Sequence, residues 1–261
     1  KMLQNYFSYC KNCQMRPENQ FLDQILNFAS QPSSTSLILD APNKYALLEM
    51  LPQFVNLKLL QISNCDLGSM FLEFMQVLNG FTSLEVLSLE NCSLTFKQSK
   101  SLMASLQQKI VHTLNLSKNE IDFPIIKISK LKNLSLKSCR LKQPDDLLEF
   151  YQLNSIIHSD LSGTLLKMEK FHLFAVQLCA NESLTINLSY CGLTKPQQKE
   201  FIQVLRLNCS VQAVFLDNLT IGEEQEITKI CFKNMQMVTT QRTQLQGERI
   251  GTYGQSILSL K

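Results

Sequence analysis

Tryptophan is absent from the 261-residue chain, histidine occurs three times and glycine eight times. No segment approaches the roughly 18 consecutive apolar residues that a membrane-spanning helix needs, so we expect no membrane insertion. Lysine and arginine are scattered and the net charge is only +3, which argues against a nucleic-acid partner. The glycine-rich loops that bind nucleotide phosphates are also missing. These absences indicate a globular protein without a cofactor.

The few histidines form no catalytic group. His112, His158 and His172 are far apart in the chain, and only His158 is followed directly by Ser159 and Asp160. Consecutive strand residues alternate between the two faces of a sheet, so these three side chains cannot meet as a catalytic triad. The sequence therefore predicts no enzyme activity, no catalytic residues and no metal site.

What the sequence does contain is a repeat. The segment LEVLSLENCSL at residues 84–94 returns as LKLLQISNCDL from Leu57, VHTLNLSKNEI from Val111 and LKNLSLKSCRL from Leu131. The common unit is L-x-x-L-x-L-x-x-(C/N)-x-L, and a weaker copy lies at residues 36–39. The clear units start at Leu57, Leu84, Val111, Leu131, Ile156, Ser183 and Val211.

Each unit combines a strand pattern with a helix pattern. The L-x-L step points two side chains to one face of a strand, whereas the residues that follow have helical spacing. Apolar residues recur at i, i+3, i+4 and i+7 from Phe71 and from Phe171, and another helix should start at Thr194-Lys195-Pro196. Such a unit cannot bury its apolar faces alone, so the copies must stack. The sequence predicts an α/β fold with one parallel sheet.

The pattern resembles the leucine-rich repeat family over residues 34–221, which hold about eight units. The long period with cysteine in the ninth position is similar to the intracellular, ribonuclease-inhibitor-like type of this family. The resemblance implies a right-handed α/β solenoid, a horseshoe with a parallel sheet on its concave face and helices on its convex face. Residues 1–33 are then expected to form an N-terminal cap, and residues 222–261 a C-terminal cap and tail.

One unit is too short for a full helix. Subtracting Val111 from Leu131 gives a unit of 20 residues, and Pro124 lies inside it. Two interpretations of residues 121–130 remain open. The segment is either ordinary variation among repeats or a notch where a partner docks.

Four cysteines share the ninth position of the unit, which favours buried thiols over disulfides. One cysteine per unit does not match the closely spaced ligand pairs of zinc sites, and the isolated Cys10-x-x-Cys13 lacks a second pair. The four cysteines of the repeat are Cys65, Cys92, Cys139 and Cys191.

The chain has several Asn-x-Ser/Thr sequences inside its predicted strands, among them those at Asn115, Asn133 and Asn187. In an exported protein these asparagines would be acceptors for glycans that obstruct packing or the open face of the sheet. We therefore expect a cytoplasmic protein in a reducing compartment.

The third, fifth and seventh positions of each unit should face the concave surface. The middle of this surface is small and polar, whereas apolar side chains are expected at both ends. Terminal caps could instead cover these ends. The candidate partner-binding residues are Leu59 and Val86 at one end, Tyr190 and Phe215 at the other, and the acidic Asp160 and Asp217.

A preorganised repeat surface without catalytic groups favours a protein–protein interaction scaffold, with protein partners that the sequence does not name. The first interpretation is a structural subunit of a larger assembly, with a ciliary axoneme or another part of the cytoskeleton as one setting. The alternatives are a substrate-recognition adaptor of a ubiquitin ligase and a regulator of an enzyme or small GTPase. An adaptor would need an F-box-like segment in residues 1–33, and a regulator an exposed arginine or a strongly charged concave face. Neither is evident.

Overall fold

The computed structural model describes residues 35–40, 42, 47–48, 50–54, 56–180 and 183–237, together with residues 11 and 23. The expected N-terminal cap, apart from residues 11 and 23, lies outside this description, as do the Cys10-x-x-Cys13 motif and the tail from residue 238 onward.

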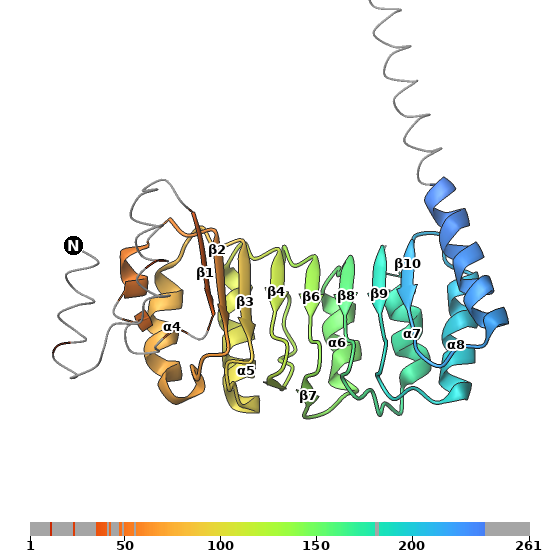
Figure 1. The fold of residues 1–261 in the computed structure, drawn as a ribbon, viewed down its shortest axis with the longest axis horizontal. Coiled ribbons are helices and arrows are strands. Elements are labelled where there is room, and N and C mark those ends of the chain that lie inside the picture. The colour runs from red at the N-terminus through yellow and green to blue at the C-terminus, as the bar shows by residue number, and fades with distance from the viewer. Residues whose placement is uncertain are drawn as a thin grey trace, which may run out of the picture.

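The fold is α/β, with one large parallel sheet whose strands follow the order of the chain (Figure 1). A separate two-stranded sheet pairs β5 (Glu120–Ile121) with β7 (Arg140–Leu141). The weak copy of the repeat at residues 36–39 is a strand, as predicted. The large sheet contains β1 (Ser36–Asp40), β2 (Leu59–Ser63), β3 (Val86–Glu90), β4 (Thr113–Asn115), β6 (Asn133–Ser135), β8 (His158–Asp160), β9 (Thr185–Asn187) and β10 (Ala213–Phe215).

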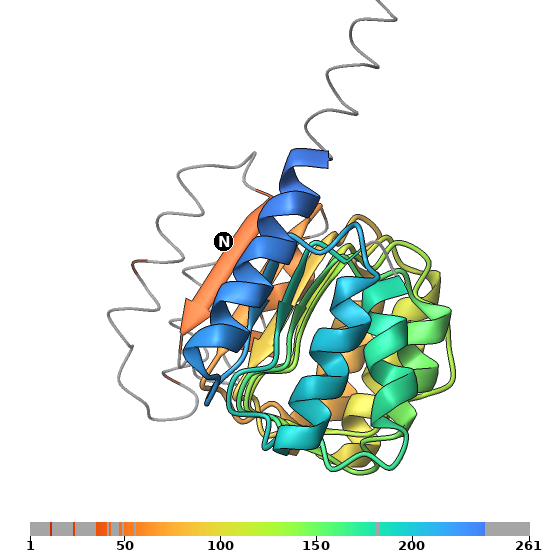
Figure 2. The ribbon, with the colours of Figure 1, turned by 90° about the vertical axis from the view of Figure 1, so that its right-hand side faces the viewer.

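Helices α4 to α8 cover one face of the large sheet, as Figure 2 shows for α6, α7 and α8. We call the other face the open face. The helix starting at Lys195 begins where the sequence predicted. Capping boxes that were not predicted pair Thr194 with Gln197 and Thr95 with Gln98. The helices are α4 (Phe71–Gly80), α5 (Phe96–Ser105), α6 (Asp146–Leu153), α7 (Phe171–Ala180) and α8 (Lys195–Arg206), with short 3-10 turns at Leu51–Gln53, Gly68–Met70 and Leu106–Gln108.

Residues 221–237 form a further helix beside β10, away from the layer of α6, α7 and α8 (Figure 2). Ile227, Cys231 and Asn234 are its buried side chains, and Asn234 Nδ2 donates to Val211 O at 2.8 Å. This helix therefore packs against the last strand. None of the helices in the described part of the chain is long and apolar enough to span a membrane.

The core lies between the sheet and the helices. In the unit that starts at Leu84, the leucines at positions 84, 87, 89 and 94 are almost completely buried, as the repeat predicts. The predicted apolar stripe of α4 is buried as well, because Phe74 and Leu78 are fully buried. Burial of apolar area in every unit is the main stabilising contribution to the stack.

The eighth position of each unit from Leu57 onward has a left-handed backbone, with φ between 53° and 72°. In five successive junctions its N–H donates to the carbonyl oxygen at the seventh position of the next unit. At Gly163 a Cβ would lie 2.8 Å from Ser138 Oγ, so a larger residue would displace that hydroxyl, and glycine also adopts this φ without strain. The five pairs are Asn64 with Glu90, Asn91 with Ser117, Lys118 with Lys137, Ser138 with Ser162, and Gly163 with Ser189, at 2.7–3.0 Å.

The ninth position explains the cysteines of the repeat. From the unit of Cys92 to that of Cys191, the side chain at this position donates to the carbonyl oxygen at the sixth position of the preceding unit. Cysteine, asparagine and threonine all perform this role, because each carries a small donor. The pairs are Cys92 Sγ to Ile62 O (3.5 Å), Asn119 Nδ2 to Leu89 O (2.7 Å), Cys139 Sγ to Leu116 O (3.2 Å), Thr164 Oγ1 to Leu136 O, and Cys191 Sγ to Leu161 O (3.0 Å).

The unit from Val111 has no helix between β4 and β6, as its length predicted. Phe123 fills the space by packing on Phe150 of α6, with ring centroids 5.1 Å apart. Asn154 Oδ1 accepts from the backbone N–H of Ile128 at 2.7 Å, so this buried amide replaces bonds that a helix would make. The row of helices is therefore interrupted between α5 and α6.

Asn119 makes the most extensive set of these junction bonds. Its Oδ1 accepts from the backbone N–H groups of Cys92 and Leu94 at 3.0 and 3.1 Å, while its Nδ2 donates to Leu89 O. We predict that Asn119→Ala lowers the free energy of unfolding by about 3 kcal/mol or more, because it leaves several buried backbone groups without partners. Asn119→Cys should cost less, since cysteine occupies this position in neighbouring units.

Urea unfolding followed by circular dichroism would measure both losses. Gln152→Ala, at an exposed position of α6, is the control and should change stability by no more than about 0.5 kcal/mol. A loss below about 1 kcal/mol for Asn119→Ala would contradict the role assigned to this amide.

The buried thiols should also be unreactive toward alkylating reagents. Burial raises the pKa of the Cys92, Cys139 and Cys191 thiols to about 12. At pH 8 we therefore predict that iodoacetamide modifies exposed Cys209 in the folded protein and leaves these three unmodified, because the thiolate is the nucleophile. Peptide mapping by mass spectrometry checks this, with urea-unfolded protein as the control in which all four react. Rapid labelling of Cys139 in folded protein would refute the prediction.

Candidate functional site

The open face carries the columns that the repeat predicted. The strand register aligns the third positions of successive units from Leu59 to Ala213, and the fifth positions from Gln61 to Phe215. Side chains in these columns are mostly half-buried, whereas those between them are buried against the helices. The predicted phase of the repeat is therefore confirmed.

Many polar side chains of the open face bond to one another across the strands. Asn115 Nδ2 donates to Ser88 Oγ at 3.0 Å, and Asn133 Nδ2 donates to Thr113 Oγ1 at 2.8 Å. Bonds of this kind connect neighbouring units and use hydrogen-bonding capacity that a partner would otherwise engage.

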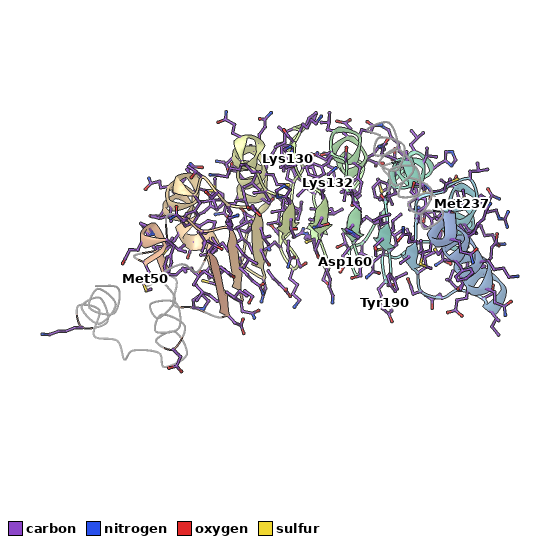
Figure 3. All side chains as sticks on the ribbon, turned by 90° about the horizontal axis from the view of Figure 1, so that it is seen from above. Met50, Lys130, Lys132, Asp160, Tyr190 and Met237 are labelled. Atoms are coloured by element: carbon purple, nitrogen blue, oxygen red, sulfur yellow. The ribbon has the colours of Figure 1, made fainter. Side chains whose placement is uncertain are left out.

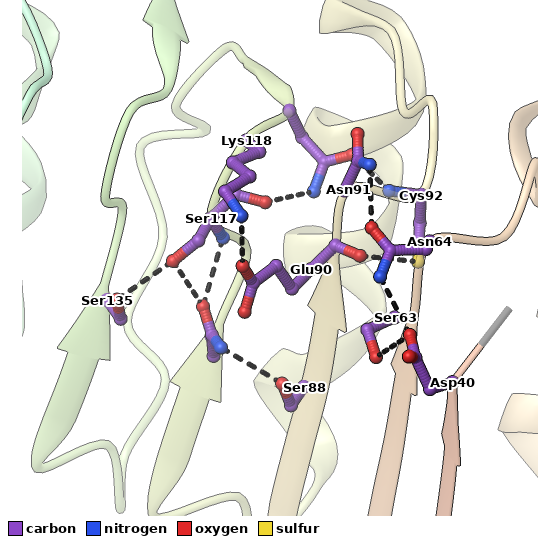
Figure 4. Close-up of polar contacts among 12 residues, drawn as sticks. Asp40, Ser63, Asn64, Ser88, Glu90, Asn91, Cys92, Ser117, Lys118 and Ser135 are labelled. Atoms are coloured by element: carbon purple, nitrogen blue, oxygen red, sulfur yellow. Dashed lines mark hydrogen bonds and ion pairs between the residues drawn. The ribbon is translucent and has the colours of Figure 1, made fainter.

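The strand ends next to β1 hold a second polar chain, shown in Figure 4. Asp40 Oδ1 accepts from Ser63 Oγ at 2.9 Å and from Asn64 Nδ2 at 2.7 Å, and Asn91 Nδ2 continues the chain to Asn64 Oδ1 at 2.8 Å. Glu90 forms an ion pair with Lys118 of the following unit, with Nζ 2.7 Å from the carboxylate. The pair balances the charge of Glu90. The polar groups named at this end of the face thus bond to one another within the chain.

A shallow hollow lies on the open face between β4 and β10, with a volume of about 270 Å³. Its lining includes two of the candidate residues, Asp160 and Phe215, together with His158 and Asn187. Most of the remaining lining is threonine, serine and asparagine, and it contains neither lysine nor arginine. Most residues that line the hollow are polar by type and almost none is charged, but the surface that they expose is mainly apolar, and an aromatic ring bounds it.

The C-terminal end of the face exposes two aromatic side chains. Tyr190 is 74% exposed and Phe215 52% exposed, so the helix of residues 221–237 leaves both accessible. Figure 3 places Asp160 and Tyr190 on the same side of the sheet, opposite the layer of helices α4 to α8. Large exposed aromatic side chains are the type that most often dominates protein binding energy.

Tyr190 also has an unusual backbone. It occupies the left-handed eighth position with φ of 59°, where the other units have asparagine, lysine, serine or glycine. A bulky residue in this region is uncommon and costs roughly 1–2 kcal/mol. The exposed ring gains little packing in return, so Tyr190 is a candidate for a role outside folding.

Asp217 has a structural task. Its Oδ1 accepts the N–H of Tyr190 at 2.7 Å, which replaces the backbone carbonyl that accepts at the five earlier junctions. The sequence analysis placed Asp217 among the binding residues without finding this bond. The carboxylate thus positions the turn that presents Tyr190.

The other end differs from the expectation. Leu59 and Val86 were expected to form an exposed patch, but both are half-buried, because they are direct neighbours in the strand register. Ile38 of β1 is the more exposed apolar residue there, at 54%, and the sequence analysis missed it. The alternation within the weak first copy could have revealed it.

The histidines take no part in a catalytic group of the kind considered from sequence. His158 and Asp160 lie on the open face, whereas Ser159 points into the core and accepts the Tyr151 hydroxyl at 2.9 Å. Burial raises the pKa of that tyrosine. His172 instead lies on α7, with Nδ1 3.1 Å from Glu200. Within the described ranges, no group of three or more His, Cys, Asp or Glu side chains is placed to hold a metal ion.

No family model and no curated protein matches the chain. Solved structures with some similarity include actin-binding site 2 of leiomodin-1, at 15% identity and a TM-score of 0.35, covering 80% of this chain and 99% of that one. The C-terminal domain of tropomodulin from Caenorhabditis elegans is similar at 11% identity and a TM-score of 0.36, covering 77% and 99%. Values this low carry no argument about the partner or function of this chain.

The strained turn at Tyr190 leads to a stability prediction. Tyr190→Asn should raise the free energy of unfolding by about 0.5–1 kcal/mol, because asparagine tolerates the left-handed region better. Chemical denaturation measures the change, and the reciprocal Asn218→Tyr, at the same position of the next unit, should lower stability. Loss of stability in Tyr190→Asn would mean that the ring packs within the folded chain.

Proposed function

We propose that this chain is a non-catalytic, protein-binding leucine-rich repeat solenoid of the intracellular type. The regular repeat of the sequence and the parallel sheet in chain order support this assignment. In such a protein the open face is the concave surface, and the helices form the convex one. Residues 1–33 and 222–261 would serve as its caps.

The observation that carries the proposal is the pair of exposed aromatic residues, Tyr190 and Phe215, beside the hollow. The frame beneath them is rigid, because each unit is bonded to the next by backbone and buried side-chain hydrogen bonds. A preorganised surface loses little conformational entropy on binding, so such anchors can contribute fully to affinity. The partner would anchor at this end of the face and contact the polar middle through hydrogen bonds.

We further propose that the protein works in the reducing cytoplasm, as a structural subunit of a larger assembly of the cytoskeleton or cilium. The free, buried cysteines of the repeat support a reducing compartment. A scaffold of this kind would hold partners in a fixed relation and would need no catalytic group.

Crosslinking mass spectrometry on the protein in its own cells, with epitope-tagged variants, tests the proposal. We expect stoichiometric crosslinks from the open face to assembly subunits, and these should fall about tenfold or more in Phe215→Ala and in Tyr190→Asn, because each removes an aromatic anchor. Leu72→Ala is the matched control, since Leu72 is 75% exposed but lies on α4, on the helix side. Leu72→Ala should leave the number of crosslinks to assembly subunits unchanged.

Crosslinks chiefly to ubiquitin-transfer proteins or to a small GTPase would favour the adaptor or the regulator instead. Equal crosslinking in Leu72→Ala and Phe215→Ala would reject the open face as the binding surface. Circular dichroism of each variant separates lost binding from lost folding.

A further inference from the structure

Three side chains form a row across the hollow. Asp160 on β8, Asn187 on β9 and Phe215 on β10 are register partners, and all three line the same hollow. Since neighbouring strands lie about 4.8 Å apart, the carboxylate, the amide and the ring are spread over roughly 10 Å. The row is therefore about as long as three residues of an extended segment, at ~3.4 Å per residue.

Asp160 is a carboxylate without a cation. Its Oδ1 accepts the N–H of Ser162 at 3.0 Å, and no lysine or arginine in the described part of the chain forms an ion pair with it. By contrast, Glu90 is paired with Lys118 on the same face. A half-buried carboxylate in a hollow lined by neither lysine nor arginine attracts a cation.

Asn187 offers a hydrogen-bond donor to the same space. Its Oδ1 accepts the N–H of Ser189 at 3.1 Å, which leaves the Nδ2 donors without a hydrogen-bond partner among the described residues. The equivalent Asn115 instead donates its Nδ2 to Ser88 at 3.0 Å. The amide of Asn187 is thus available within the hollow for an acceptor, such as a peptide carbonyl.

Phe215 lies at the β10 end of the row and exposes its aromatic ring. Aromatic faces attract cations, and the planar guanidinium group stacks on them more often than an ammonium group does. A carboxylate and an aromatic ring about 10 Å apart across the strands suit a long side chain with a flat, charged end.

We propose that this hollow binds an arginine side chain presented by an extended segment of a partner protein. The guanidinium group donates to the Asp160 carboxylate and lies against Phe215, while a main-chain carbonyl of the segment accepts from Asn187 Nδ2. This inference rests on the proposed function, because it names the chemistry of the partner at that surface. A lysine would reach the carboxylate, but its ammonium group lacks the flat face that stacks on the ring.

The test is an NMR titration of the full, isotope-labelled chain with acetyl-Gly-Arg-Gly-amide. The lysine and citrulline analogues are titrated in parallel, and citrulline keeps the shape of arginine without its charge. We expect shifts concentrated at Asp160, Asn187 and Phe215, with the citrulline peptide binding about tenfold or more weakly.

Asp160→Asn is the diagnostic variant. It removes the charge and keeps an oxygen that can accept from Ser162, as Asn115 and Asn187 do at the equivalent position of their units. Binding of the arginine peptide should fall about tenfold or more, with the amide spectrum otherwise preserved. Glu224→Gln, in the helix of residues 221–237 and exposed, is the charge-matched control and should bind normally.

Equal binding of the arginine and citrulline peptides, or unchanged binding by Asp160→Asn, would overturn the inference, as would the absence of shifts at millimolar peptide. In each of these cases, open-face crosslinks that depend on Phe215 would show that protein binding survives and that only the arginine chemistry is wrong. If those crosslinks are missing as well, the proposed function fails with it.

Discussion

The hydrogen bond between the left-handed turn of one unit and the backbone of the next is the interaction on which the rest of the structure depends. It recurs at five successive junctions with nearly constant length, between backbone groups that no substitution except proline removes. This bond fixes where each strand ends relative to its neighbour. The columns of the open face and the buried ninth-position side chains then follow from the same register.

The repeat pattern was sufficient to predict the parallel sheet, the phase of the strands and the missing helix near Pro124. These features depend on apolar periodicity and on a proline, and both signals can be read within a single repeat unit. Thr164 shows the limit of the pattern. It occupies the cysteine slot and makes the same bond to the preceding unit, because the position requires a small donor rather than a particular residue type.

Exposure and pairing were harder to predict than orientation. The sequence assigned Leu59 and Val86 to the correct face, but their mutual packing across two strands was not visible from either repeat alone. In the same way, nothing within the unit of Tyr190 indicates that Asp217, 27 residues later, would hold its backbone N–H. The repeat phase placed His158, Asp160, Asn187 and Phe215 on the open face, but the hollow that they line together emerged only from the structure.

The replacement of a backbone carbonyl by the Asp217 carboxylate bears on how such a chain can change its length. An extra unit inserted among the earlier ones would meet the same backbone junction on both sides and could be accommodated without new chemistry. A unit added after Asp217 would meet a junction made by a side chain and a position already occupied by the helix of residues 221–237. Duplication within the array, rather than growth at this end, is the route by which evolution or protein engineering could lengthen it.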